Sequence, residues 1–168
     1  MANHLVRITD KDYRDYRRSY SRIVYSINQK GKPPVVSEET VNELSNSLLG
    51  GGIMGKGDFL DMMDQPEKYA LYFLKNDDEQ IIGVLSLLFR EKSCYIGEFA
   101  VFERGKGLGT ELYALTLEEI ALRNVKLIEL SSPPPFAGAR EFWKKKGFTL
   151  KHGSDSVFEK RVKFHYKK

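Results

Sequence analysis

The stretch Arg104-Gly105-Lys106-Gly107-Leu108-Gly109 decides how the rest of the chain is interpreted, because it stands between a predicted strand and a predicted helix. Its glycines carry no side chains, so the backbone can come close to a ligand. The first amides of a helix have no intrahelical partner, and with the positive end of the helix dipole they bind phosphate oxygens. Arg104 and Lys106 add positive charge. The stretch therefore predicts a pyrophosphate site at a strand-to-helix junction.

The sequence on both sides of this stretch predicts a sheet of mixed strand directions. Three apolar segments joined by short turns precede it and predict an antiparallel meander, at 69–74, 81–89 and 94–102. A helix at 107–123 follows, with apolar residues on two sides, which indicates that it is well buried. The next strand, 125–130, is expected to run parallel to 94–102, because a helix joins the two.

The remaining elements complete one predicted domain over residues 1–168. Towards the N-terminus we expect a strand at 5–8 and helices at 12–29, 37–49 and 58–63. Towards the C-terminus we expect a helix at 137–146 and a closing hairpin of strands at 148–151 and 157–164. No repeat or linker divides the chain.

Composition restricts the class of protein. The chain has 168 residues, a net charge of +4 and one cysteine, Cys94, so an intrachain disulfide is excluded. Its basic residues are spread rather than clustered on one predicted face, which argues against nucleic acid as a partner. The sequence has neither an apolar run of about 20 residues nor the apolar core of a signal peptide. These observations favour the cytoplasm and argue against a membrane partner.

Two other phosphate-binding motifs fit less well. A dinucleotide motif needs a third glycine where the chain has Thr110, although Glu129 near the end of the next strand could bind a ribose. That motif also follows the first strand of a parallel sheet, not a meander. A phosphate loop could be sought at 50–56, but Gly57 stands where Ser or Thr should bind magnesium.

The best fit is to the GNAT superfamily of N-acetyltransferases, which the chain resembles over nearly its whole length. The superfamily has Arg/Gln-x-x-Gly-x-Gly/Ala at the start of its central helix, and residues 104–109 match this pattern. The strand Phe99-Ala100-Val101 resembles its cofactor-facing strand, and residues 139–148 resemble its second signature. The resemblance implies an α/β (α+β) fold with a mixed, mostly antiparallel central sheet of six to seven strands. Helices flank this sheet, and two parallel strands splay apart at the cofactor site.

The resemblance also implies a binding site for acetyl-CoA, with no metal. In the superfamily, the backbone of the first splayed strand pairs with the pantetheine arm, which here points to Phe99 and Val101. The pyrophosphate would lie on the amides of the turn, and the thioester near Ser131. The residues expected to bind the cofactor are Phe99, Ala100, Val101, Arg104, Gly105, Lys106, Gly107, Leu108, Gly109, Thr110 and Trp143.

The implied reaction is direct attack of a neutral amine on the thioester carbonyl. An ammonium has no lone pair, so a base must take its proton. Glu98 is the candidate catalytic base, because it lies in an otherwise apolar strand beside the expected thioester and burial would raise its pKa. An ion pair is the alternative role for this carboxylate. A backbone N–H near Val101 could stabilise the oxyanion.

The chain departs from the family pattern in three places. Trp143 replaces a tyrosine that donates a proton in many relatives, and an indole N–H is not a usable acid. Phe136 replaces a common asparagine, and the turn before Arg104 is about two residues shorter than usual. The tyrosines that could substitute as the acid are Tyr95, Tyr113 and Tyr166.

The acceptor region should comprise residues 10–68 and the C-terminal strands. Most aromatic residues of the first helix are expected to pack in the core, and acidic residues between 38 and 64 could attract a cationic amine. His152 and His165 are further candidate bases. We therefore expect an N-acetyltransferase that acts on a small-molecule or peptide amine, with an exposed C-terminal strand edge that permits a homodimer. The alternatives are a CoA-binding regulatory module with little or no catalysis and a nicotinamide-nucleotide binder.

Overall fold

The central sheet confirms the predicted fold class. The structure, a computed structural model, describes residues 3–28, 54–103, 105–132 and 137–164. Its sheet has seven strands in the order β1-β2-β3-β4-β5-β7-β6. The strands are β1 (His4–Arg7), β2 (Tyr69–Lys75), β3 (Ile81–Phe89), β4 (Ser93–Val101), β5 (Leu127–Ser131), β6 (Thr149–Leu150) and β7 (Val157–Arg161).

The described helical elements agree with the predicted ones within a few residues. They are the 3₁₀ turn η1 (Asp10–Asp12) and the helices α1 (Tyr13–Asn28), α3 (Lys56–Met63), α4 (Leu108–Ala121) and α5 (Ala137–Lys145). The helix expected at 37–49 lies outside the described residues. No helix in the described part of the chain combines the length and apolar character needed to cross a membrane.

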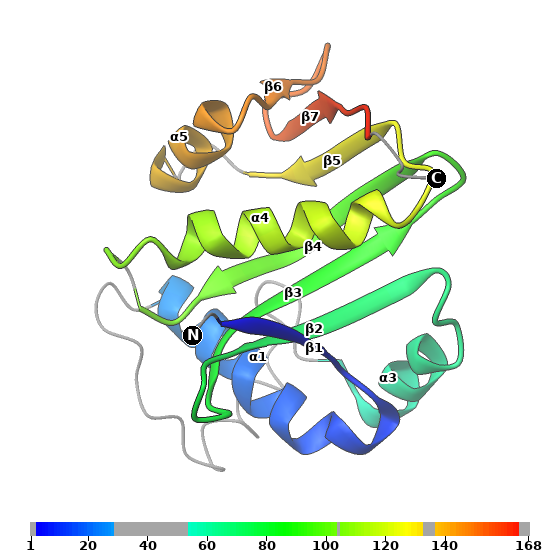
Figure 1. Ribbon diagram of the computed structural model, residues 1–168, viewed down its shortest axis with the longest axis vertical. Helices are drawn as coiled ribbons and strands as arrows, with labels where there is room; N and C mark the ends of the chain where they lie inside the picture. Colours follow the sequence, from blue (N-terminus) through cyan, green and yellow to red (C-terminus); the bar gives the residue numbers. More distant parts are fainter. Residues whose placement is uncertain (1–2, 29–53, 104, 133–136, 165–168) are drawn as a thin grey trace.

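One pair of neighbouring strands near the centre of the sheet is parallel, and all the other pairs are antiparallel (Figure 1). Strands β1 to β4 form an antiparallel series, as the short turns between β2, β3 and β4 predicted. α4 then leads from β4 to β5, and these two strands are parallel. β7 returns antiparallel to β5, and the short strand β6 pairs with β7 at the edge. The predicted terminal hairpin is therefore confirmed, with both strands shorter than predicted.

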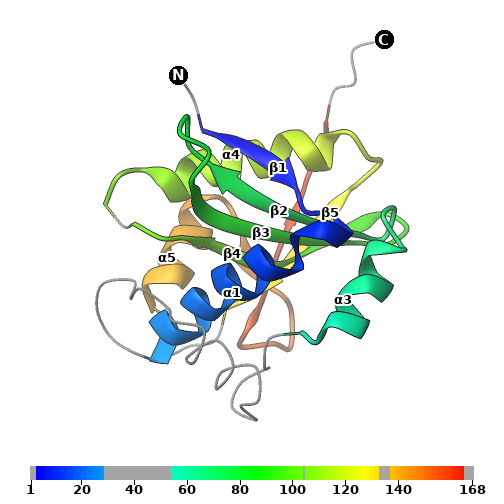
Figure 2. The same cartoon turned by 90° about the horizontal axis from the view of Figure 1, so that it is seen from below.

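Helices cover both faces of the sheet (Figure 2). α4 lies on one face, and α1 and α3 lie on the other. β2 accordingly buries five consecutive residues, 70–74, because neither of its faces meets water. Apolar side chains form one core cluster on each face, and the cluster beneath α1 contains Tyr16, Tyr20 and Phe59. The expected core role of the helix aromatics is confirmed for Tyr16 and Tyr20.

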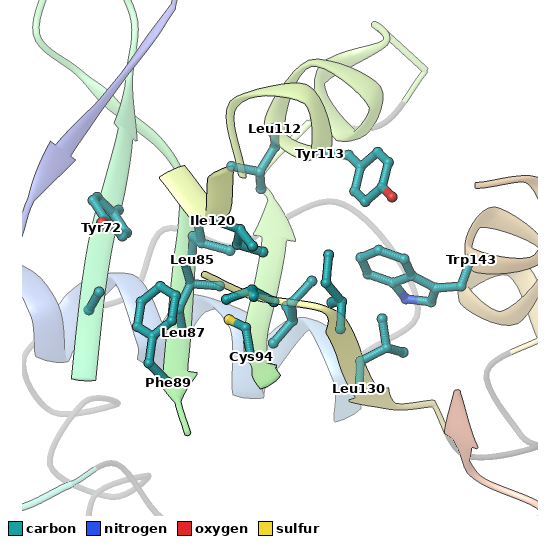
Figure 3. Packing of buried hydrophobic residues seen from close by; sticks show 14 of the residues in the cluster. Tyr72, Leu85, Leu87, Phe89, Cys94, Leu112, Tyr113, Ile120, Leu130 and Trp143 are labelled. Carbon is teal, nitrogen blue, oxygen red and sulfur yellow. The ribbon is translucent and has the colours of Figure 1, made fainter. Parts of the chain in front are cut away.

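The cluster beneath α4 holds α4, α5 and β5 together (Figure 3). Leu112, Tyr113 and Ile120 of α4 pack there with Trp143 of α5 and Leu130 of β5. The prediction that α4 is buried on two sides is wrong at its end. Leu122 follows the last residue of the helix and is 78% exposed.

Candidate functional site

The N-terminus of α4 presents unpaired backbone donors. Gly107 is the N-cap, with the left-handed backbone angle φ of 73°, and as a glycine it has no side chain with which to cap the helix. The first intrahelical bond runs from the Glu111 amide to the Gly107 carbonyl, so the amides of residues 108–110 precede the helical ladder. Gly105 also has a positive φ, 80°. A Cβ atom on either glycine would meet no atom of the described residues within 4 Å, so backbone conformation rather than space requires glycine here.

Two lysines lie beside this turn. Lys106 forms an exposed ion pair with Glu103, with a nitrogen-to-oxygen distance of 2.5 Å, and this contact lowers the pKa of Glu103. Lys146, the residue after the end of α5, places its Nζ atom 3.3 Å from Oγ1 of Thr110. Residues 144, 145 and 146 are all lysines, and the fold brings Lys146 to this turn. Arg104 lies outside the described residues.

A β-bulge interrupts the pairing of β4 with β3. The register shifts by one, so Gly97 and Glu98 stand together opposite the single residue Ser86. On its other side, β4 pairs with β5 only as far as Ile96 opposite Leu130. The parallel strands therefore separate at the bulge, where the resemblance implied a splayed pair. Sequence reasoning missed the bulge, for which a glycine inside a strand was the available signal.

Beyond the bulge, β4 offers backbone groups to the gap between the strands. The Phe102 amide donates to the Ile82 carbonyl, and hydrogen-bonding direction alternates along an antiparallel pair. Ala100 and Phe102 therefore point their backbone groups towards β3. Phe99 and Val101 point theirs away from β3, to the side where β5 has diverged. This is the orientation that an extended, amide-containing ligand would need.

Aromatic side chains support this segment from the α4 face. The ring of Phe99 lies 4.8 Å from the Trp143 ring and 5.7 Å from the Phe142 ring, measured between centroids. Figure 3 shows the Trp143 indole pointing from α5 towards the strands, beside Tyr113. Trp143 is only 6% exposed. The role of Trp143 in a cofactor site stays a prediction. Because the indole is buried, that role would be to pack against Phe99 rather than to contact the cofactor.

Glu98 projects from the opposite face of β4, towards α1. The side chain is exposed, although the sequence suggested a buried one. The pKa of its carboxyl is nevertheless raised, because protein atoms displace part of the surrounding water. The two observations are compatible, since a carboxyl open to water on one side still loses hydration on the others. The charge of Glu98 in turn helps to raise the pKa values of Tyr16 and Tyr20, after the larger effect of their own burial.

Among the residues that sequence reasoning proposed as acids, Tyr95 lies closest in sequence to the bulge. Its hydroxyl donates to Oγ of Ser131, at 2.9 Å, where β5 leaves β4. Tyr113, on the buried face of α4, is 6% exposed, and burial raises its pKa. His152 is exposed in the turn between β6 and β7. Phe136, His165 and Tyr166 lie outside the described residues.

An uncapped helix N-terminus beside a splayed parallel pair is the arrangement expected of the acetyltransferases that the sequence resembles. The model of the acetyltransferase (GNAT) family matches residues 24–148. The chain belongs to this family. The turn at Gly105 to Gly107 leads into α4, and β4 and β5 are the parallel strands that separate.

Known proteins similar to this GNAT chain include one curated relative and many solved structures. The protein YxbD of Bacillus subtilis is 34% identical over 79 residues, which cover 47% of this chain and 50% of that protein. The chain thus matches only about half the length of this relative.

Two solved structures share the fold. The PaiA N-acetyltransferase from Thermoplasma acidophilum, in complex with coenzyme A, is 16% identical and has a TM-score of 0.67. The match covers 96% of this chain and all of that one. A GNAT acetyltransferase from Elizabethkingia anophelis with acetyl-CoA bound has a TM-score of 0.51 and 16% identity, over 61% of this chain and 82% of that one.

Proposed function

We propose that this chain transfers an acetyl group from acetyl-CoA to a primary amine, by direct attack within a ternary complex. The observation that carries the proposal is the separation of β4 from β5 beside the uncapped N-terminus of α4. The gap leaves backbone groups for the pantetheine arm, and the helix end leaves amides for the pyrophosphate. Two structures with this fold contain CoA or acetyl-CoA, which supports the assignment.

The proposed cofactor site uses both elements. The backbones of Phe99 and Val101 would bind the pantetheine arm, with Ala100 between them. The turn from Arg104 to Thr110 would bind the pyrophosphate, with Lys146 as an additional cation. No metal is required by this arrangement, because helix amides and lysines supply the positive potential.

Glu98 is the proposed catalytic base. Its raised pKa brings the carboxylate closer to the range in which it can accept a proton from an amine at neutral pH. Glu98 projects from the face of β4 that is covered by α1, whereas Phe99 projects from the other face. We assign the α1 face to binding of the acceptor amine. Attack would then join the amine nitrogen to the thioester carbon, and the backbone N–H near Val101 would stabilise the oxyanion. Collapse of this intermediate would break the C–S bond and release CoA as a thiolate, which takes a proton from water.

The acceptor assay tests this proposal. We expect acetyl-CoA and a panel of primary amines, including polyamines, lysine and peptide N-termini, to release free thiol faster than acetyl-CoA alone. Tight CoA binding without acceptor-stimulated release would favour the regulatory module instead. The buried Trp143, which lacks the acidic hydroxyl of many relatives, is the observation that favours this second function. Calorimetric titration with CoA and with NAD distinguishes these two functions, which both require CoA binding, from a nicotinamide-nucleotide binder.

The Lys146→Gln variant tests the extra cation. Because Lys146 reaches Thr110 at the helix N-terminus, we expect the variant to bind CoA roughly 10-fold more weakly, with a larger loss at low salt. Lys145→Gln removes the same charge from an exposed neighbour on α5 and should leave the affinity within about two-fold. Calorimetric titration at two salt concentrations measures both. Equal losses in the two variants would show a general charge effect instead.

The remaining partner assignments stay predictions. We expect cytoplasmic location, one domain over residues 1–168, and neither nucleic acid nor membrane as a partner. The edge strand β6 offers only two residues to a homodimer, so sedimentation rather than fold geometry has to decide the oligomeric state.

A further inference from the structure

Ser86 holds the β-bulge that carries Glu98. Its Oγ atom accepts a hydrogen bond from the Glu98 amide, at 2.7 Å. The same oxygen would lie 2.7 Å from a Cβ atom on Gly97, which is closer than real Cβ atoms approach. Gly97 has no positive φ angle, so this contact with Ser86 is what requires glycine there. The Ser86 hydroxyl thus fixes the backbone of Glu98 by a hydrogen bond, and it can come this close only because Gly97 has no side chain.

Tyr20 of α1 lies beside this bulge with an unused hydroxyl. The side chain is 7% exposed, and its hydroxyl oxygen is buried without a hydrogen-bond partner among the described residues. Ser86 and Glu98 are close enough to influence the pKa of the phenol, although the Ser86 hydroxyl does not meet it in hydrogen-bonding geometry. Burial raises the pKa of Tyr20 far above its ordinary value, so the phenol keeps its proton at every working pH. A buried donor without an acceptor costs free energy, and an acceptor that becomes charged nearby would remove this cost.

We propose that Ser86 and Tyr20 are positioning residues for Glu98. Ser86 fixes the bulged backbone of Glu98, and Tyr20 holds a hydroxyl ready to donate to its carboxylate when the carboxylate is ionised. This inference rests on the proposed role of Glu98 as the base. Tyr16 and Tyr20 of α1 interact electrostatically with Glu98, and Arg22 of the same helix lies over the Phe102 ring, at 4.2 Å. Tyr95 and Glu129 project from the same sheet face on the paired side of the bulge.

The Ser86 contribution is tested by a cycle of Ser86→Ala, Gly97→Ala and the double variant. Ser86→Ala should lower kcat roughly 10-fold while leaving KM for acetyl-CoA unchanged, because the carboxylate loses its alignment and the cofactor site does not change. Gly97→Ala should lower Tm by roughly 5 °C, because the new Cβ atom meets Ser86 Oγ. The double variant should regain most of that Tm but keep the low kcat. Full kcat in Ser86→Ala, or no recovery of Tm in the double variant, would overturn the role of Ser86.

The Tyr20 contribution is tested by the Tyr20→Phe variant. Loss of a donor to the carboxylate should raise the Glu98 pKa by about half a pH unit or more, measured by carbon-13 NMR of the labelled carboxyl. The acidic limb of the kcat/KM profile should move to higher pH by the same amount. Tyr13→Phe is the matched control, because that hydroxyl bonds to the Met54 carbonyl, at 3.0 Å, and should leave both values unchanged. An unchanged Glu98 pKa in Tyr20→Phe would overturn the role of Tyr20.

The NMR measurement separates this inference from the proposed function. If the wild-type protein released no thiol with any amine, the acyltransfer proposal would fail. The Glu98 pKa in Tyr20→Phe and the Tm values of the Ser86 and Gly97 variants would still decide whether the two hydroxyls support the carboxylate.

Discussion

A Gly107→Val variant should lose CoA affinity by at least about 100-fold, which corresponds to about 2.7 kcal/mol of binding free energy. Gly107 is the left-handed N-cap of α4, and the space beyond its Cα atom is open. A valine side chain would project into the space that a pyrophosphate needs. It would also favour a backbone angle that turns the helix amides away. Both effects act on binding and leave the core of the protein untouched.

The chain offers a matched control for the backbone strain itself. Gly153, in the turn between β6 and β7, has a φ angle of 81° and equally open surroundings. Gly153→Val should therefore lose a similar amount of stability, about 1–2 kcal/mol, without losing CoA affinity. Calorimetric titration gives the affinities, and thermal unfolding gives the stabilities.

The comparison of these two variants decides where the pyrophosphate lies. Wild-type affinity in Gly107→Val would place the pyrophosphate away from this turn. If Gly153→Val lost affinity as well, the effect would come from general strain, and the α4 N-terminus would lose its support as the binding site.

The sequence predicted the sheet well because its strands carry local signals. Apolar residues and short turns mark β2, β3 and β4, and the predicted limits of β3 match the structure. The helix between β4 and β5 required parallel strands, and the structure has them. At the end of α4 the local signal failed. Leucine is apolar wherever it stands, and no periodicity shows that Leu122 follows the last helical turn and faces water.

The candidate site was less predictable, because it depends on contacts between distant segments. The phosphate turn is a local motif, so its residues could be named from the sequence. The bulge arises where Ser86 meets two residues of another strand, and no single segment contains that information. In the same way, α5 ends with several lysines, and only the packing of α5 against α4 selects Lys146. Glu98 was named correctly as a group with a raised pKa, but its surface is more open than the apolar strand suggested.

A Glu98→Gln variant should lower kcat by roughly 10²- to 10³-fold, since a positioned base contributes that much to proton transfer. CoA affinity should stay within about two-fold of the wild type, because the side chain faces α1, away from the Phe99 and Trp143 rings. In the wild type, kcat/KM should rise with pH as the carboxylate ionises, and this limb should disappear in the variant. Glu118→Gln, on the exposed side of α4, is the control that removes the same charge elsewhere.

The raised pKa of Glu98 also gives this variant a stability signature with a defined sign. An acid whose folded-state pKa is raised stabilises the fold fully below its ordinary pKa of about 4.3, and loses this contribution as pH rises through the folded-state value. Glutamine does not ionise, so the variant should gain stability relative to the wild type over that pH range and keep the gain at neutral pH. Urea unfolding at a series of pH values measures this difference. Wild-type kcat together with the expected stability gain would mean that the carboxylate is desolvated but that a water path, rather than Glu98, takes the proton from the amine.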